Sequence, residues 1–173
     1  IGSVADVNAA LAAVAFTPSA NNDQNFTPTT RIPHAAHTGP PDGTLTFTVN
    51  PTNDAPVITL PGSIAVTEDL ATALTSISIS DVDAGSGGVT ASFSVGSGAL
   101  TATSGGGVTV GGTSSALTLT GSIANLNAFI AASNIAFTTA NNATASVTLT
   151  IGVDDGGNTG SGGAQSDTDT IAV

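Results

Sequence analysis

The chain contains two copies of one sequence pattern, and this internal repeat constrains its fold more than any other feature. Residues 2–17 match residues 121–138, with a short insertion in the second copy, and residues 44–49 match residues 168–173. The period is about 120 residues, whereas solenoid repeats have periods of about 20 to 50 residues. A unit of this length is the size of a whole domain. The sequence therefore predicts two copies of one module.

The repeat register divides the chain into a partial and a nearly complete module. We interpret residues 1–50 as the C-terminal half of one module, residues 51–56 as an interdomain linker and residues 57–173 as a near-complete module. Half a module has unpaired strand edges and an open core. We expect its missing strands either to precede Ile1 in a longer protein or to come from another chain by strand addition.

Short alternating stretches separated by turn residues predict that each module is built from strands. Residues 76–80 alternate serine with isoleucine, the pattern of a strand with one buried face. Clusters of glycine, asparagine and aspartate separate the stretches. Further strands are expected at residues 57–60, 63–67, 89–95, 99–103, 108–110, 117–120, 145–153 and 168–173.

One helix is expected between these strands. Ser122 can cap a helix in which Ile123, Leu126 and Ile130 follow helical spacing, with Asn125 and Asn127 facing solvent. The first copy repeats the pattern near the start of the chain. Many short strands with one short helix per module predict an all-β fold, with immunoglobulin-like β-sandwich modules in tandem.

The charge of the chain excludes two classes of partner. Twelve acidic residues oppose a single base, Arg31, and the net charge is −11. Nucleic-acid binding depends on basic side chains that displace counterions, and anionic membrane surfaces attract basic segments. No apolar run approaches the ~20 residues that span a bilayer. We therefore expect no nucleic-acid partner and no membrane insertion.

The residue types present do not form an enzyme motif. The chain has no cysteine, no recognisable Ser–His–Asp arrangement and no phosphate-binding loop, because the glycine run 105–107 lacks the required lysine. It also has no tryptophan or tyrosine to stack against a sugar. We predict that the chain is not an enzyme. Without disulfides, a secreted module needs another source of stability, and bound metal ions are one.

The acidic residues form clusters that are typical of calcium sites. Asn53 and Asp54 lie in the linker, Asp81 and Asp83 follow an expected strand, and Asp155 precedes a glycine pair. Calcium takes six to eight oxygen ligands from loops that can wrap around the ion. Aspartate and glycine are also common turn residues, and a single cluster would be explained in that way. Three clusters that converge on a linker favour a cation site.

These motifs resemble those of cadherins. Residues 50–56 resemble the linker pattern Asp-x-Asn-Asp-Asn-Ala-Pro with the central pair reversed, residues 81–83 the Asp-x-Asp pair, and residues 155–157 the late Asp-Gly-Gly loop. The chain is similar above all to the cadherin-like tandem repeats of giant bacterial surface proteins and adhesins. Those repeats carry a Thr-Glu-Asp strand end and a Ser-Asp-Val-Asp-Ala-Gly loop, found here at residues 67–69 and 80–85.

The resemblance implies cadherin-like modules whose joints bind calcium ions (Ca2+). It assigns Asn53, Asp54, Asp81, Asp83 and Asp155 as metal ligands at the joint before the near-complete module. Glu68 would serve the joint beyond Val173. The sequence departs from the cadherin pattern in two ways: the Asp-Arg-Glu motif is missing, and Asn50 replaces an anionic ligand. Fewer anionic ligands predict a weak, roughly millimolar affinity for calcium.

The function that the resemblance implies is structural and adhesive. We expect a repeat of an extracellular protein on the bacterial cell surface or in a biofilm, made rigid by calcium. Its partners would be neighbouring modules, identical chains, and a cell-surface or matrix ligand. An alternative is a subunit of an extracellular filament or surface layer polymerised by strand exchange between chains. A more distant alternative is an accessory module of a secreted polysaccharide-degrading enzyme.

Overall fold

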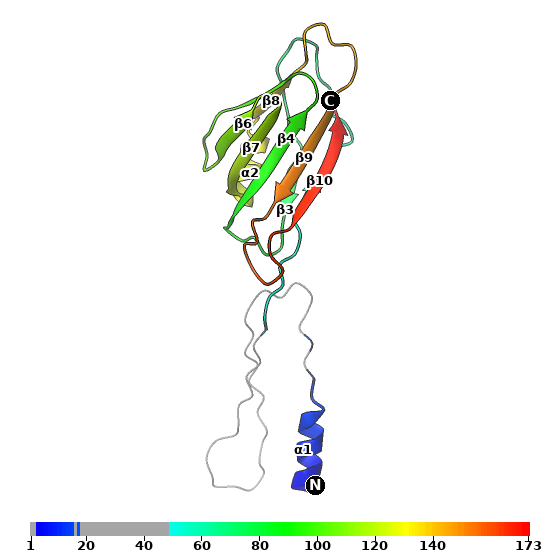
Figure 1. Ribbon diagram of the computed structural model, residues 1–173, viewed down its shortest axis with the longest axis vertical. Coiled ribbons are helices and arrows are strands. Elements are labelled where there is room, and N and C mark those ends of the chain that lie inside the picture. The colour runs from blue at the N-terminus through cyan, green and yellow to red at the C-terminus, as the bar shows by residue number, and fades with distance from the viewer. Residues whose placement is uncertain (1–2, 16, 18–48) are drawn as a thin grey trace. The chain divides into compact units, whose positions relative to one another are not determined.

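The computed structural model describes residues 3–15, 17 and 49–173, and the chain divides into two units, Ile1–Val49 and Asn50–Val173 (Figure 1). In the first unit the structure describes helix α1 (Val4–Ala12). The side chains of Ser3 and Asp6 cap it reciprocally: Ser3 Oγ accepts from the Asp6 N–H at 3.2 Å, and Asp6 Oδ2 accepts from the Ser3 N–H at 2.9 Å. The helix expected in the first copy of the repeat is therefore confirmed. Residues 44–49, which match the expected strand 168–173, lie outside the described residues except for Val49.

The second unit is mostly β-sheet. Its largest sheet has five antiparallel strands in the order β10-β9-β4-β7-β6 (Figure 1). The bounds are β4 (Gly88–Val95), β6 (Thr109–Thr113), β7 (Ala116–Ser122), β9 (Thr148–Asp154) and β10 (Ser166–Ala172). Side chains of β4 are alternately exposed and buried, so one face of this sheet covers the core.

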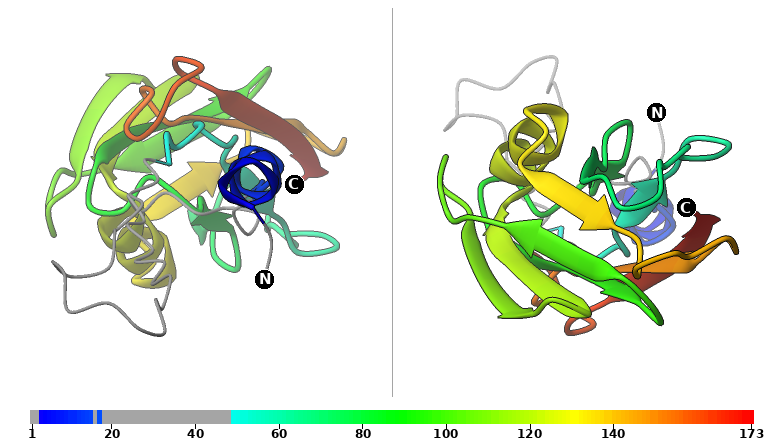
Figure 2. Two further views of the ribbon diagram at one scale, coloured as in Figure 1. Left: turned by 90° about the horizontal axis from the view of Figure 1, so that it is seen from below. Right: turned by 90° about the horizontal axis from the view of Figure 1, so that it is seen from above.

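Two smaller sheets complete the unit. A three-stranded sheet has the order β2-β8-β5, and a two-stranded sheet pairs β1 with β3. The bounds are β1 (Val57–Thr59), β2 (Thr72–Ala73), β3 (Ser78–Ser80), β5 (Ala99–Ala102) and β8 (Ile135–Thr138). Figure 2 shows β8 on the opposite side of the core from the five-stranded sheet. Phe93 of the large sheet and Phe137 of β8 are both fully buried in one hydrophobic cluster.

Helix α2 (Ile123–Ala131) follows β7 directly. Ser122 is its N-cap and accepts a hydrogen bond from the Asn125 N–H at 3.3 Å, as the sequence predicts. The buried residues Leu126, Phe129 and Ile130 attach the helix to the core. The described stretches 3–15 and 49–173 contain no helix that is long and apolar enough to cross a membrane.

The all-β class is confirmed, but three local expectations are wrong. Residues 63–67 form no strand, although Ile64 and Val66 are half-buried and alternate with exposed neighbours. Strands β2 and β8 were not expected, since two and four residues are too few to show a period. Asn127 does not face solvent: its side-chain amide hydrogen-bonds to the backbone of Ile79 in β3.

Candidate metal centre

Three segments converge at one end of the second unit, which we call the linker end. They are the linker around Asn53, the loop 81–85 that follows β3, and the loop 155–165 between β9 and β10. The linker enters β1, and β3 leads into Asp81. Since Val57 pairs with Ser80, the linker and the 81–85 loop emerge from adjacent strand ends. The third segment is joined by backbone hydrogen bonds between linker residues 51 and 53 and Ser161, at 2.9 and 2.8 Å.

Asn53 is the central residue of the linker end, and its side chain is only 2% exposed. Its amide nitrogen donates two hydrogen bonds, to Asp155 Oδ2 at 2.6 Å and to the Gly163 carbonyl at 2.8 Å. The amide oxygen, Asn53 Oδ1, is buried and has no partner among the described residues. The two donated bonds fix the orientation of the amide, so this oxygen is held in place without a donor.

Asp155 orients Asn53, and both of its carboxylate oxygens accept hydrogen bonds within the protein. Its side chain is 0% exposed. Oδ1 accepts from the N–H groups of Gly157 at 2.7 Å and Gln165 at 2.8 Å, while Oδ2 accepts from Asn53. Burial acts to raise the pKa of Asp155, but these three donors outweigh it and hold the pKa below its ordinary value. The carboxylate is therefore ionised and committed to hydrogen bonds in this conformation.

Asp81 and Asp83 each use one carboxylate oxygen within the protein and leave the other unpaired. Asp81 Oδ1 accepts from the N–H groups of Asp83 and Ala84 at 3.0 and 3.1 Å. Asp83 Oδ2 accepts from the Asp54 N–H at 2.7 Å, which joins this loop to the linker. The remaining oxygens, Asp81 Oδ2 and Asp83 Oδ1, are buried and have no partner within the described part of the chain. Burial raises the pKa of Asp81, and the adjacent Asp83 carboxyl raises it further.

These unpaired oxygens are what a hard cation would need. Asn53 Oδ1, Asp81 Oδ2 and Asp83 Oδ1 are the three buried side-chain polar atoms without a partner in the described residues, and all three lie at the linker end. An unsatisfied buried polar group costs about 1–3 kcal/mol, so such groups need an explanation such as a bound ion. One amide and two carboxylate oxygens are ligands that calcium accepts. The residues present therefore fit calcium.

The linker end holds fewer acidic groups than a typical metal cluster. Groups of three or more His, Cys, Asp or Glu side chains arranged to hold a metal ion are absent from the described residues. The unpaired set contains two carboxylates, because the third oxygen belongs to Asn53 and Asp155 is occupied by hydrogen bonds. Asp54 is half-buried nearby and contributes its backbone N–H to Asp83. The coordination sphere would need further oxygens from backbone carbonyls or water.

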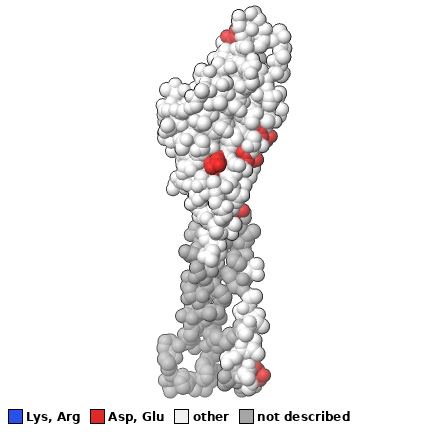
Figure 3. Space-filling view, viewed as in Figure 1, with Lys and Arg blue, Asp and Glu red and all other residues white. Residues whose placement is uncertain are grey.

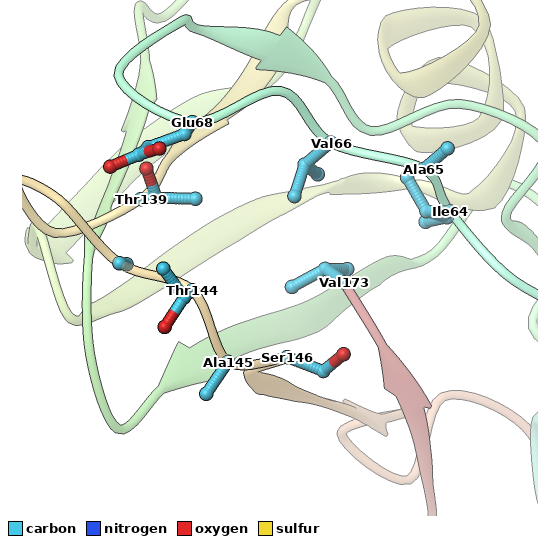
Figure 4. Close-up of a pocket in the computed structure, with 10 residues that line it drawn as sticks. Ile64, Ala65, Val66, Glu68, Thr139, Thr144, Ala145, Ser146 and Val173 are labelled. Carbon is cyan, nitrogen blue, oxygen red and sulfur yellow. The ribbon is translucent and has the colours of Figure 1, made fainter.

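Glu68 lies at the other end of the unit, which we call the distal end. Strand β10 runs from Ser166, opposite Asp154, to Ala172, opposite Thr148, which is about 20 Å for seven strand residues. Glu68 is exposed and borders a cavity of about 320 Å³ together with Val173, the residue after β10 (Figure 4). The structure therefore brings five of the six expected ligand residues together and separates the sixth.

The second unit carries acidic side chains but no basic ones. This unit contains no lysine, arginine or histidine. Its nine acidic residues are Asp54, Glu68, Asp69, Asp81, Asp83, Asp154, Asp155, Asp167 and Asp169. Figure 3 shows one face, on which the acidic groups of this unit are scattered rather than gathered into a single patch. Metal ions from solution are therefore the available source of positive charge within this unit.

The sequence did not reveal the residues that support Asn53 from the β9–β10 loop. The Gln165 side chain donates to the Asn53 carbonyl, and the Asn158 side chain donates to the Asp155 carbonyl and to the Gly88 carbonyl. Gly160 has a φ of +97°, and a Cβ there would lie 2.7 Å from the Asn53 nitrogen. The loop composition predicted only turns, because these roles depend on contacts with segments 70 and 112 residues away in sequence.

Comparisons with known proteins leave the family of this chain open. No protein-family model matches the chain, and no curated protein or solved structure matches it either.

Proposed function

We propose that the chain is a structural repeat of an extracellular bacterial surface protein, with cadherin-like β-sandwich modules in tandem that calcium makes rigid at the linker. The observation that carries the proposal is the set of three buried, unpaired oxygens on Asn53, Asp81 and Asp83. The all-β fold and the position of these oxygens beside the linker are what such a role requires. The role is mechanical and not catalytic.

The ligand chemistry favours calcium over other common metal ions. All three unpaired atoms are oxygens, whereas zinc prefers histidine nitrogen and cysteine sulfur, and the second unit contains neither residue. Magnesium demands near-ideal octahedral geometry, while calcium accepts irregular sites of six to eight oxygens. Two unpaired carboxylates supply little negative charge, which supports the expected millimolar affinity. Extracellular fluids contain calcium at that concentration, so this affinity fits the proposed location.

A bound cation would stiffen the linker by tying it to the module that follows. The Asp54 N–H already contacts Asp83, and Pro51 and Pro56 restrict the backbone on either side. A cation between Asn53, Asp81 and Asp83 would offset the cost of burying two like charges and would add bonds between linker and loop. Glu68 at the distal end would serve the next joint in the same way. The partners would be neighbouring modules, identical chains, and a cell-surface or matrix ligand.

Calcium titration of the full chain tests the proposal. We expect calorimetry with calcium chloride to give a roughly millimolar Kd. At ten times Kd, calcium should raise the Tm by about 4–8 °C, because ligation of this strength adds about 1.4 kcal/mol. Asp83→Asn should abolish both the binding of calcium and the calcium-dependent increase in Tm. Asp154→Asn is the matched control, because Asp154 immediately precedes Asp155 at the linker end but is exposed, and the one described hydrogen bond of its side chain is accepted from the Gly156 N–H. A wild-type Tm that calcium and a chelator leave unchanged would refute the proposal.

The segment 62–66 supports the alternative of strand exchange between chains. Its backbone makes no hydrogen bond with another described residue, although Ile64 and Val66 pack against the core. One cavity of about 320 Å³ lies beside the segment near Val173, and another of about 240 Å³ lies beside it near β2. An extended segment held so weakly could be replaced by the strand of another chain. Light scattering at micromolar concentration tests this, and a strictly monomeric 16.5 kDa species would contradict it.

A further inference from the structure

The linker and the 81–85 loop, which carry the unpaired oxygens, are attached to the two strands of one short ribbon. Strands β1 and β3 form a separate two-stranded sheet of three residue pairs, with Ile58 opposite Ile79 at its centre. The linker with Asn53 enters β1, and Asp81 directly follows β3. An isolated two-stranded ribbon is marginally stable in water. Whatever holds the ribbon therefore also holds the unpaired oxygens relative to one another.

Asn127 holds the outer edge of β3. Its side-chain oxygen accepts from the Ile79 N–H at 2.9 Å, and its side-chain nitrogen donates to the Ile79 carbonyl at 2.8 Å. The N–H and C=O of one strand residue point to the same side, so both groups of Ile79 point away from β1. The Asn127 side chain thus makes the two hydrogen bonds that the backbone of a neighbouring strand would otherwise make with Ile79. Helix α2 carries this side chain, and the buried neighbours of Asn127 fix the helix in the core.

Asp167 holds the opposite edge of the ribbon. Its Oδ2 accepts from the Ile58 N–H at 2.9 Å, and this N–H points away from β3. Asp167 belongs to β10 of the five-stranded sheet and lies opposite Val153 in β9. The central residue pair of the ribbon is therefore bonded on one side to α2 and on the other side to the large sheet.

We propose that Asn127 and Asp167 are positioning residues for the cation site. Neither supplies one of the unpaired oxygens. Together they hold the two-stranded ribbon in place. The ribbon in turn sets the distance between Asn53, in the linker before β1, and Asp81 and Asp83, in the loop after β3. This inference rests on the proposed function, since it assumes that the three oxygens bind a cation. Groups that orient metal ligands typically change metal affinity by about 10- to 100-fold when they are removed.

The internal repeat supports a role for the asparagine. Asn8 in α1 stands at the position that corresponds to Asn127 when residues 2–13 are aligned with residues 121–132. Asparagine is a poor choice for the interior of a helix on propensity alone. Its presence at this position in both copies is expected if each module uses the side chain to hold a strand.

Calcium titration of the full chain with two pairs of variants tests the inference. Asn127→Ala and Asp167→Ala should each raise the Kd for calcium by about tenfold. Asn125→Ala is the control on the same helix, since no described hydrogen bond joins the Asn125 side chain to β3. Asp169→Ala is a closely matched control for Asp167→Ala. Both carboxylates accept from the following N–H at 2.8 Å, but only Asp167 also contacts Ile58. The controls should bind calcium within twofold of wild type.

Hydrogen exchange in the calcium-free protein separates this inference from the proposed function. Asn127→Ala should accelerate exchange of the Ile79 N–H, and Asp167→Ala that of Ile58, while the amides of β4 and β9 keep wild-type protection. Asn127→Asp keeps an acceptor for the Ile79 N–H and loses the donor, so it should give an intermediate Kd. It also serves as the milder variant if Asn127→Ala does not fold.

The possible outcomes lead to different conclusions. If wild type binds calcium and all four alanine variants bind it equally well, the positioning role is wrong and the proposed function stands. If wild type does not bind calcium, the proposed function fails, and with it the role of these residues in cation binding. Unchanged exchange at Ile58 and Ile79 in the variants would overturn the claim that the two side chains hold the ribbon.

Discussion

Acidic residues lie at both ends of the second unit, but they are buried at the linker end and exposed at the distal end. At the linker end, Asp83 and Asp155 are buried, and backbone N–H groups hold their oxygens. At the distal end, Glu68 and Asp69 are exposed, and the Glu68 side chain borders an open cavity. The linker end therefore presents oxygens that are fixed before any ligand arrives. The distal end would need another module to complete a site, which explains why clustering in sequence alone does not identify a preorganised site.

The largest effect is expected from removing the buried carboxylate of the linker end. Asp155→Ala leaves the N–H groups of Gly157 and Gln165 and one of the two N–H groups of the Asn53 side chain without an acceptor. We expect it to lower the free energy of unfolding by about 3 kcal/mol or more. Glu68→Ala, the counterpart at the distal end, should change it by less than about 0.5 kcal/mol. Urea unfolding of both variants measures the difference. Equal effects would show that the two ends do not differ in this way.

A smaller effect is expected from the contact between the β9–β10 loop and the linker. Gly160→Ala places a Cβ 2.7 Å from the Asn53 nitrogen, so it should cost about 1–3 kcal/mol beyond its backbone strain. Gly162→Ala is the matched control, because its φ is also positive, at +123°, while nothing lies within 4 Å of its Cβ. Thermal unfolding of the two variants isolates the contact. A Gly160→Ala protein as stable as Gly162→Ala would mean that the loop does not constrain the linker.

Asp81→Asn should have opposite effects with and without calcium. In the calcium-free protein the substitution removes a half-buried charge beside Asp83, so the Tm should rise slightly. With calcium at ten times the wild-type Kd, the stabilisation of about 1.4 kcal/mol should disappear. Glu68→Gln removes a charge at the distal end and should leave the calcium response intact. The prediction fails if Asp81→Asn responds to calcium as wild type does, or if it destabilises the calcium-free protein.

The smallest effect is a pH dependence that comes from Asp155. Its pKa is lowered in the folded state, so its ionised form contributes stability that is present above the ordinary value of 3.8 and is lost as the pH falls through the lowered pKa. Asp81 has the opposite sign, because its pKa is raised. Urea midpoints of wild type and Asp155→Asn should therefore converge as the pH falls below 3.8. A gap that stays constant down to pH 2 would contradict the assigned hydrogen bonds.

Much of the candidate site could be predicted from short motifs. The sequence motifs correctly grouped Asp81 and Asp83 with the linker, and the structure places Asp155 beside Asn53. Motifs could not show which oxygens remain unpaired, because that depends on which donors reach each atom. Asp155 was expected as a ligand, yet its two oxygens accept three hydrogen bonds from the linker and its own loop.

The local sequence pattern determined the fold class, and contacts between distant segments determined the candidate metal site. The strict alternation of β4 and the capped apolar repeat of α2 require only neighbours in sequence, so strands and helix could be read directly. Residues 63–67 alternate in the same way but form no strand, since pairing needs an edge from elsewhere in the chain. The side-chain amide of Asn53 is held by Asp155, a residue 102 positions away in sequence. That hydrogen bond determines where the unpaired Asn53 Oδ1 points. A metal site of this kind is a property of the folded module, because hydrogen bonding between distant segments decides which oxygens are left for the ion.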